Sequence, residues 1–599
     1  MYSKTLATIR SEIAKCITDF EISTSAVSLD RTPSQEMGDV TCNIALKYSK
    51  NAKISPFALA NKIAGHLLSR KIKDVKTIEV IKPGFINITF SEDFFSSLLK
   101  DILNQGSGFG SNTDLSGEKW VVEHTSPNPN KAMHLGHLRN NLVGMGLVRL
   151  LKWNGASVVS DAVDNNRGIA IAKLMWGFLA HMRKKDDLPI DVTYWISHKD
   201  EWLAPSEIGI KPDLFVTKCY VLGESDFKQS SEVENKVRNF VVEWENHNEQ
   251  IWNLWSHVLN YAYEGMNRTL SRLENHWDVI WHEHEHYQSG KEYVERGLKE
   301  GIFKQLEDGA ILTDLSAYNI SDTILLKRDG TSLYITQDIA LTVLKKNRYG
   351  ADKLVWVIGP EQSLAMKQLF AVCEQLGIGD IHDFTHIPYG YVGLKGESGG
   401  FKKMSSREGT VVLIDDVIDQ VKEKIHQRFL NEGKVDSEIM EELSERLAIA
   451  SVKFALLKPD RTQDITFDTE KSIETSGDSG IYILYTYVRT QSILRKKEVA
   501  KDTHDFSKFI FNDQKDEKRL LWLLLFLPDV IKMARSDLSV HGIAQYLLEI
   551  CSAFNSWYAK EPILDGSPRE NYKLALTKSV GIVIKNGLSI LGVPIVEEI

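Results

Sequence analysis

The chain has 599 residues, a formal net charge of −9, and hydrophobic and charged contents of 43% and 26%. This composition is ordinary for a soluble globular protein of three or four domains, and the charge argues weakly against a nucleic-acid coat protein without excluding an enzyme that has local basic surface. No apolar run approaches the roughly 18–20 residues of a membrane span, and the N-terminal stretch lacks the apolar core of a signal peptide, so we expect a cytoplasmic protein with no membrane partner.

Residues 1–112 are expected to form a small α+β accessory domain. Helical periodicity covers 2–20 and roughly 56–70, and the strand-like segments TIEVIKP and FINITF surround the turn at Pro83-Gly84. A stretch rich in Gly, Ser and Asn, residues 106–117, reads as the linker that follows.

Residues 113–412 have the pattern of an α/β core. A short apolar strand (120–125), a helix from about His134 that Gly155 ends, and a second strand (157–164) form a βαβ unit, whose crossover is normally right-handed. The apolar segment KLVWVIG and the helix after it supply a second strand–helix pair. We therefore expect a Rossmann-like, doubly wound sheet, interrupted by an insertion over about 185–350 whose first part, 185–235, is polar and weakly periodic.

The remainder of the chain is helical. Amphipathic spacing begins at 414 and continues almost to the end, which predicts a helical connection over 413–455 and an all-α bundle over 456–599.

The motif HLGH lies where the first loop of the core becomes a helix. A helix N-terminus at the carboxyl edge of a parallel sheet favours anionic phosphate, and imidazoles there can donate to phosphate oxygens. Gly136, between the two histidines, permits close approach of the backbone. A single histidine is more often structural than catalytic, but a pair that flanks a glycine at this turn indicates a phosphate site made by His134 and His137.

The segment FKKMSSREGTVV (401–412) is a basic loop that contains glycine. Taken alone, KMSS is as often a solvated loop as a functional one. Lys402 and Lys403 are point charges suited to neutralising a pyrophosphate leaving group.

HLGH followed about 270 residues later by KMSSR resembles the paired signatures of class I aminoacyl-tRNA synthetases. The finer pattern is similar to the arginyl-tRNA synthetase family: EHTSPN at 123–128, a lysine three residues before HLGH, TSLYITQDIA at 331–340, and GPEQSLAMKQLF at 359–370. MGDVTCNIALKYSK and PGFINITF resemble that family's N-terminal domain, and the segments near 480–496 and 553–564 resemble its anticodon-binding domain. The resemblance covers nearly the whole chain and is weakest over 185–235.

The resemblance implies a set of site residues. A guanidinium is always charged and is best bound by carboxylates, and Glu123 at a strand end and Asp338, one helical turn after Tyr334, could converge on one pocket. The expected arginine-binding residues are Glu123, Ser126, Asn128, Tyr334, Asp338 and Gln362. The expected ATP-binding residues are His134, Gly136, His137, Lys402, Lys403, Met404, Ser405 and Ser406, and the expected catalytic residues are His134, His137, Lys403 and Lys131, the last on the opposite side of the phosphates. The expected tRNA-binding residues are Phe85, Asn87, Tyr485, Arg489, Trp557 and Tyr558.

The activity that the resemblance implies is arginine–tRNA ligation, by a monomer whose partners are L-arginine, ATP with Mg²⁺, and tRNA(Arg). Two alternatives stay open. One is a class I synthetase for another amino acid, such as glutamate or cysteine, although no cysteine–histidine cluster is present to grip a thiol. The other is an RNA-binding paralogue that has lost catalysis.

Two features disfavour a metal site. Five cysteines stand singly with no CxxC pair, as buried free thiols would, and HEHEH (282–286) could chelate zinc on a strand but has no second ligand cluster. We therefore expect no structural zinc.

The chain also departs from the family at 164–168, which replaces a GDWG-like turn, and at Ala365-Met366, where His-Phe is usual.

Overall fold

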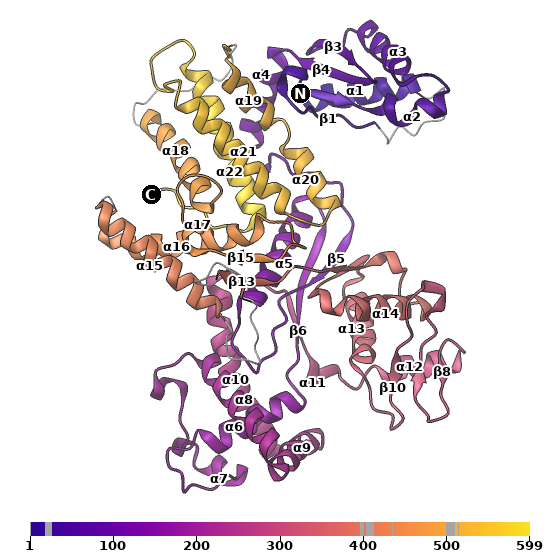
Figure 1. Ribbon diagram of the computed structural model, residues 1–599, viewed down its shortest axis with the longest axis vertical. Coiled ribbons are helices and arrows are strands. Elements are labelled where there is room, and N and C mark those ends of the chain that lie inside the picture. Colours follow the sequence, from indigo (N-terminus) through magenta and orange to yellow (C-terminus); the bar gives the residue numbers. More distant parts are fainter. Residues whose placement is uncertain are drawn as a thin grey trace. The chain divides into compact units, whose positions relative to one another are not determined.

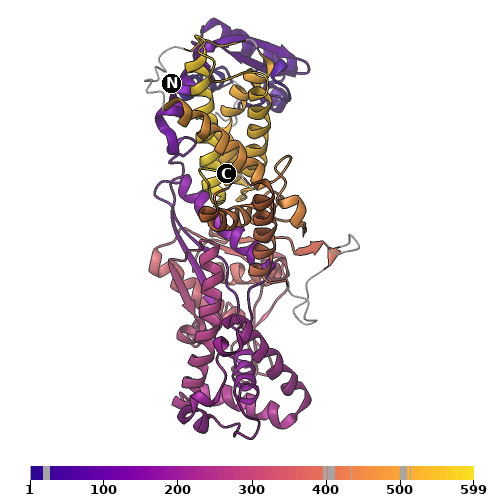
Figure 2. The same ribbon diagram turned by 90° about the vertical axis from the view of Figure 1, so that its left-hand side faces the viewer.

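The computed structural model describes residues 2–17, 27–395, 401–402, 412–433, 435–498, 509–512 and 514–599. The chain divides into two compact units, which Figures 1 and 2 show in two views. Unit 1 comprises Met1–Ser111, Glu474–Asp537 and Gly542–Ile599, and unit 2 comprises Asn112–Ile473 with Leu538–His541.

Unit 2 is built on a five-stranded sheet with strand order β12-β11-β5-β6-β7. Every neighbouring pair is parallel, as the βαβ pattern predicted. Helix α5 (Leu135–Trp153) makes the crossover between β5 and β6. The strands are β5 (Lys119–Glu123), β6 (Ser157–Asp164), β7 (Val279–His282), β11 (Lys353–Val357) and β12 (Phe384–Ile387).

Helices cover both faces of this sheet because successive strand residues point to opposite sides. Val122 packs in one core cluster with apolar residues of α5, and its neighbour Val121 packs in another with residues of α13 (Tyr334–Tyr349) and α14 (Ser363–Gln375). The sheet is therefore buried on both faces, and polar functional side chains are expected at the carboxyl ends of its strands.

The insertion expected over 185–350 is not a single unit. Strand β7 lies within that range and pairs with β6 in the main sheet, so the expectation of one continuous insertion was wrong. The strand pattern was missed because Val279–His282 is only four residues long and ends in a histidine. Before β7, helices gather at one end of unit 2, coloured magenta in Figures 1 and 2. They are α6 (Ile169–His181), α7 (Val192–Ser197), α8 (Pro212–Gln229), α9 (Ser231–Glu245) and α10 (Glu249–Arg272).

The close packing of α6 on α8 depends on two glycines. A Cβ on Gly177 would lie 1.8 Å from the carbonyl oxygen of Cys219, and a Cβ on Gly223 would lie 2.0 Å from that of Lys173. Tryptophans fill the core beneath, among them Trp195 and Trp202. These helices therefore form a packed layer despite the polar sequence.

The rest of unit 2 contains two small sheets and two long helices. Strand β15 pairs with β13, so residues 456–473, which the sequence grouped with the helical bundle, belong to unit 2. The elements are α11 (Glu283–His286), α12 (Lys291–Lys299), β8 (Lys304–Gln305), β9 (Ile311–Leu312), β10 (Ile324–Leu326), β13 (Val392–Lys395), β14 (Phe401–Lys402), α15 (Ile414–Glu432), α16 (Ser437–Leu457), β15 (Ile465–Phe467) and α17 (Thr469–Ser472).

The N-terminal part of unit 1 is the expected α+β fold. Its antiparallel sheet has the order β1-β2-β4-β3, and Ile86 and Ile88 of the inner strand β4 are buried in its core. The elements are α1 (Tyr2–Ile17), β1 (Asp30–Arg31), β2 (Val40–Cys42), α2 (Ile44–Ala52), α3 (Pro56–Ser69), β3 (Val75–Ile81), β4 (Phe85–Phe90) and α4 (Glu92–Gln105).

The C-terminal part of unit 1 is the expected helical bundle. Helix α22 is long and apolar enough to cross a membrane, so the expectation that no stretch reaches that length was wrong, but 78% of its apolar window is buried, as in a core helix. The helices are α18 (Gly480–Glu498), α19 (Lys515–Leu524), α20 (Leu527–Ser536), α21 (His541–Tyr558) and α22 (Glu570–Leu591).

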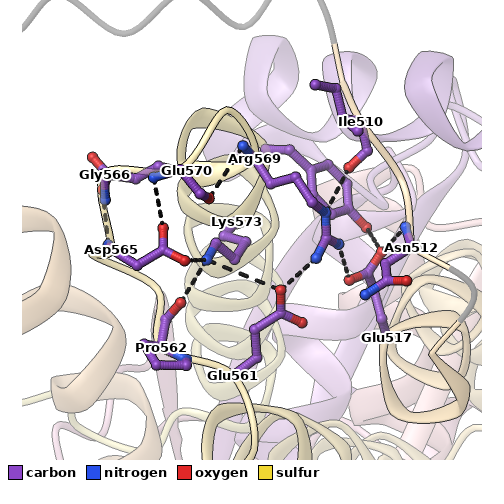
Figure 3. Close-up of polar contacts among 12 residues, drawn as sticks. Ile510, Asn512, Glu517, Glu561, Pro562, Asp565, Gly566, Arg569, Glu570 and Lys573 are labelled. Atoms are coloured by element: carbon purple, nitrogen blue, oxygen red, sulfur yellow. Dashed lines mark hydrogen bonds and ion pairs between the residues drawn. The ribbon is translucent and has the colours of Figure 1, made fainter.

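A buried ionic network fastens the loop after α21 onto α22 (Figure 3). The carboxylate of Glu517 accepts hydrogen bonds from Arg569 at 2.5 Å and from the hydroxyl of Tyr572 at 2.9 Å. Lys573 is 2.6 Å from both the carboxylate of Asp565 and the carbonyl oxygen of Pro562. Because each buried charge has partners, the network can be accommodated in the bundle.

Candidate active site

The two histidines of HLGH cap the N-terminus of α5. The Nδ1 atom of His134 accepts from the backbone N–H of Gly136 at 3.1 Å, and the Nδ1 atom of His137 accepts from the N–H of His134 at 3.2 Å. The two rings are stacked, with centroids 3.9 Å apart. This is a reciprocal capping box, made by imidazoles in place of the usual hydroxyl and carboxylate.

This geometry fixes the tautomer of both rings. Burial lowers the pKa of His134 to about 4, helped by nearby Lys131, and burial lowers the pKa of His137 well below its ordinary value. Both imidazoles are therefore neutral at pH 7, and because Nδ1 of each accepts a hydrogen bond, the proton resides on Nε2. Each ring thus has one N–H donor at the helix N-terminus, where the backbone dipole favours anions.

The chain that leaves KMSSR lies against this same helix end. The backbone of His134 bridges to Leu413, and the N–H of Leu135 donates to the carbonyl of Val412 at 3.2 Å. Lys403, Met404, Ser405 and Ser406 lie outside the described residues, and of Lys402 only the backbone, in β14, is described. Residues 412–413, which follow the second signature in the chain, therefore contact the helix end that carries the first.

The loop between β5 and α5 is held by side chains that sequence reasoning missed. Thr125 has a φ of +55°, a rare conformation for a β-branched residue. The carboxamide oxygen of Asn140 accepts from the N–H of Thr125 at 2.6 Å, and its nitrogen donates to the carbonyl of Val357, at the end of β11, at 2.7 Å. Asn141 donates to Asn275 at 2.7 Å. The signal in the sequence was the pair of adjacent amides, Asn140 and Asn141, shortly after HLGH in a helix rich in leucine and valine.

A close approach of α5 to this loop also requires a glycine. A Cβ on Gly144 would lie 2.2 Å from the Cβ of His124. The His124 ring is buried between Thr125 and Ser160, with nitrogen–oxygen distances of 2.7 and 2.8 Å. Its neighbour Glu123 is thereby held at the end of β5.

Glu123 pairs with a buried lysine, which the sequence did not single out. The Nζ atom of Lys345, on α13, is 2.6 Å from Glu123 and 2.9 Å from Asp161 of β6. Glu123 and Asp161 face each other across the β5–β6 pair. Burial raises the pKa of Glu123, with Asp161 adding to the effect and Lys345 opposing it. Burial alone would lower the pKa of Lys345, but the two carboxylates raise it above its ordinary value, so the lysine is charged.

Asp338 lies two helical turns before Lys345 on α13. Burial together with the charge of Glu123 raises the pKa of Asp338 to about 7, although Lys345 opposes the change. Tyr334, the first residue of the helix, is 81% exposed, and Gln362, just after β11, is exposed as well. The structure therefore groups Glu123 and Asp338 around Lys345 and leaves the other two side chains open to solvent.

The three remaining predicted residues of this edge have varied surroundings. The hydroxyl of Ser126 accepts from the N–H of Val163 at 2.9 Å, which ties the loop to β6. Asn128 is exposed, and its carboxamide oxygen accepts from Asn165 at 3.2 Å. The ammonium of Lys131 lies 4.9 Å from the ring centroid of Tyr220.

The HEHEH segment does not form a strand. His282 ends β7, and Glu283–His286 make the single turn α11. Within the described part of the chain, no group of three or more His, Cys, Asp or Glu side chains could hold a metal ion. The five cysteines are free and buried, as expected.

Both departures from the family pattern are packed into the structure. Asp164 accepts from the hydroxyl of Tyr263 at 2.6 Å and lies 2.7 Å from His282, and Arg167 stacks on Tyr287 at 3.8 Å. Met366 is buried in the cluster beside α14. The substituted residues therefore support the framework of the site.

The predicted tRNA-binding residues divide by exposure. Arg489 is exposed on α18 and lies 5.3 Å from the ring of Tyr558, which is 38% exposed, whereas Tyr485 is partly buried. Trp557 is fully buried, so we no longer assign it a stacking role. In β4, Phe85 is partly buried and Asn87 is buried, its carboxamide oxygen accepting from Thr41 at 2.6 Å.

The parallel sheet and the histidine-capped helix, with residues 412–413 packed against the end of that helix, define a class I aminoacyl-tRNA synthetase. The family model described as "tRNA synthetases class I (R), catalytic domain" matches residues 99–179 and 197–469. The "Arginyl tRNA synthetase N terminal domain" model matches residues 5–90, and the "DALR anticodon binding domain" model matches 483–599. The chain belongs to the arginyl-tRNA synthetase family.

Similar proteins agree with this assignment. The arginine–tRNA ligase of Treponema denticola is 30% identical over 583 residues, covering 95% of this chain and 94% of the relative. That of Parabacteroides distasonis is 30% identical over 594 residues, covering 96% of each. Arginyl-tRNA synthetase from Thermus thermophilus has the same fold, with a TM-score of 0.77, 20% identity, and coverage of 99% of this chain and 100% of that one. These findings do not favour a class I synthetase for another amino acid.

Proposed function

We propose that the chain activates L-arginine with ATP, giving arginyl-adenylate and pyrophosphate, and then transfers the arginyl group to the terminal ribose of tRNA(Arg). One observation carries the proposal. A single loop, between β5 and α5, joins the buried carboxylate of Glu123 to the two neutral imidazoles that cap α5. A carboxylate suits a guanidinium, and the capped helix end suits phosphate, so the two substrates would meet across this loop.

The imidazoles act on the triphosphate. In the activation step, the carboxylate oxygen of arginine attacks the α-phosphorus, and the bond from that phosphorus to the bridging oxygen of pyrophosphate breaks. Nε2–H of His134 and of His137 would donate to phosphate oxygens as negative charge grows on them. Both donors are already oriented by the capping hydrogen bonds, so little reorganisation is needed at the moment of reaction.

The cations of the site would neutralise the leaving group. Lys131 lies just before the capped helix end, and Lys402 and Lys403 belong to the segment whose following residues, 412–413, contact that end. Met404, Ser405 and Ser406 complete this proposed ATP subsite. Mg²⁺ would arrive with ATP as part of the substrate, because no carboxylate cluster among the described residues could hold it alone.

The carboxylates select the amino acid. Glu123 and Asp338 would pair with the guanidinium, and the exposed side chains of Tyr334 and Gln362 would cover it after binding. Ser126 and Asn128 would contact the α-amino and carboxylate groups of arginine.

Recognition of tRNA falls to unit 1. The exposed pair Arg489 and Tyr558 offers a cation and a ring on which unpaired bases can stack. Phe85 and Asn87 of β4, together with Tyr485, are weaker candidates because they are less exposed.

We expect the protein to act as a cytoplasmic monomer. Light scattering after size-exclusion chromatography would test the oligomeric state.

The deciding assay is ATP–pyrophosphate exchange with each amino acid, with and without tRNA. We expect exchange with arginine. Exchange with glutamate and not with arginine would refute the proposal, and the absence of any exchange by folded protein would favour a paralogue without catalysis.

A lysine variant tests the role of KMSSR. Lys403→Ala should slow adenylate formation far more than it weakens arginine binding, because the ammonium acts on the leaving group. Lys424→Ala, at an exposed lysine of α15, is the matched control and should leave both unchanged. Equal losses in rate and in binding for Lys403→Ala would contradict a leaving-group role.

A further inference from the structure

Lys345 is a buried charged residue of unit 2 that the sequence did not single out. Its side chain is 2% exposed, and its ammonium contacts two carboxylates that come from neighbouring strands of the sheet. Those partners, Glu123 and Asp161, are 222 and 184 residues away in the sequence, which is why no local motif revealed the contact. Lys345 therefore connects α13 to the end of β5 and to β6 at one point.

The arrangement is unfavourable for stability alone. A buried ion pair is often no more stable than apolar side chains of similar volume, because desolvation offsets the attraction. Here part of the free-energy cost of desolvation is not offset, because the Oδ1 atom of Asp161 is buried without a hydrogen-bond partner. Its other oxygen accepts from Trp281 Nε1 at 2.8 Å. Three buried charges in contact, with one atom unsatisfied, call for an explanation other than packing.

The charges around the lysine supply that explanation. Glu123 and Asp161 carry two negative charges and Lys345 one positive charge, and Asp338 adds a further carboxyl group on the same helix. The ammonium limits the repulsion among these groups, so that Glu123 can remain ionised beside Asp161. The cluster still has an excess of carboxylates over cations, which one incoming guanidinium would balance.

Position matters as much as charge. Lys345 follows Asp338 by seven residues, so the two lie near the same face of α13, two turns apart. By fastening that face to the strand that carries Glu123, the lysine sets the separation of the two carboxylates that would receive the guanidinium. We propose that Lys345 is a positioning residue for arginine recognition, which holds Glu123 and the Asp338-bearing face of α13 in register and keeps Glu123 available to the guanidinium. This inference rests on the function proposed above.

The first experiment replaces the lysine and follows arginine and ATP separately. Lys345→Met should raise the KM for arginine at least tenfold at pH 7 and change the KM for ATP less than twofold. Lys345→Arg, which keeps the charge and can bridge both carboxylates, should recover most of the loss. Lys453→Met is the matched control, because Lys453 is also a buried lysine of unit 2 but bonds to the carbonyl of Leu273, away from this cluster.

The second experiment separates charge from packing. Without the ammonium, the pKa of Glu123 should rise, so the loss of arginine affinity in Lys345→Met should be greatest near pH 6 and smaller near pH 9. Adding Asp161→Asn removes the repelling charge, and the double variant should regain at least part of the arginine affinity lost in the single one. A merely structural lysine would give a loss independent of pH, and the second substitution would then make it worse.

Direct binding of arginine by calorimetry distinguishes this inference from the proposed reaction. If the wild type binds arginine but does not exchange pyrophosphate, the proposed reaction fails and the binding series still decides the role of Lys345. If the wild type exchanges with arginine and Lys345→Met binds it as tightly as Lys453→Met does, the inference is overturned. If the wild type does not bind arginine at all, both are overturned.

Discussion

Replacing Asp338 by asparagine should stabilise the fold and weaken arginine binding. Its pKa of about 7 lies roughly three pH units above the ordinary value, which corresponds to about 4 kcal/mol at 1.36 kcal/mol per unit. Because the side chain is only half-buried, solvent screening reduces this to about 2 kcal/mol. The folded state binds the proton more tightly than the unfolded state, so the stability of the fold falls as pH rises from about 4 to 7.

Asp338→Asn removes this penalty and the charge together. At pH 8 the variant should unfold at a higher urea concentration, by about 2 kcal/mol of unfolding free energy, while arginine binding should weaken by on the order of 2–4 kcal/mol because the guanidinium loses a charged partner. Urea titration followed by fluorescence measures the first, and calorimetry measures the second. A variant that is less stable than wild type but binds arginine normally would refute the reasoning.

The same carboxyl group should make arginine binding depend on pH. Only the ionised form pairs with the guanidinium, so the apparent dissociation constant should rise about tenfold from pH 8 to pH 6, as one proton with a pKa near 7 requires. In Asp338→Asn this dependence should disappear. A pH profile that is the same in wild type and variant would assign the titration to another group.

Three further predictions concern the framework and the tRNA surface. Gly144→Ala should destabilise unit 2 by about 1–3 kcal/mol, because the new Cβ would lie 2.2 Å from the neighbouring histidine, whereas Gly65→Ala, in open space on a helix, should stabilise the protein slightly. Glu517→Gln should cost the bundle about 2 kcal/mol in urea unfolding, because Arg569 loses a buried anionic partner but keeps Glu561. Arg489→Ala should raise the KM for tRNA about tenfold in aminoacylation assays.

Each of these predictions has a result that would contradict it. Equal stability changes for Gly144→Ala and Gly65→Ala would mean that α5 can move away from the loop. If Glu517→Gln were as stable as Lys560→Ala, which breaks only an exposed ion pair, the buried network would contribute no more to the stability of the bundle than a surface pair does. If Arg489→Ala and Arg238→Ala, the latter on helix α9 of unit 2, gave the same KM for tRNA, Arg489 would be excluded from the tRNA surface.

The local architecture of unit 2 follows from patterns within short stretches of the chain. Periodicity and turn residues place β5, α5 and β6 within a few residues of their observed bounds, because strand and helix patterns are properties of neighbouring residues. They also place His134 and His137 at a helix N-terminus, where the capping partners are the next residues in the chain. A phosphate site of this kind can be predicted because it is built from one short segment.

Contacts between segments far apart in the chain could not be predicted, because they depend on how the elements pack in three dimensions. The contact of Lys345 with Glu123 and Asp161 depends on how α13 lies on the sheet. Burial separates Trp557 from its neighbour Tyr558, since successive helical residues point in directions about 100° apart and only one of them faces the core. The sequence therefore indicated which residue types the site uses, and the packing of elements onto the sheet determined which charged side chains meet at its carboxyl edge.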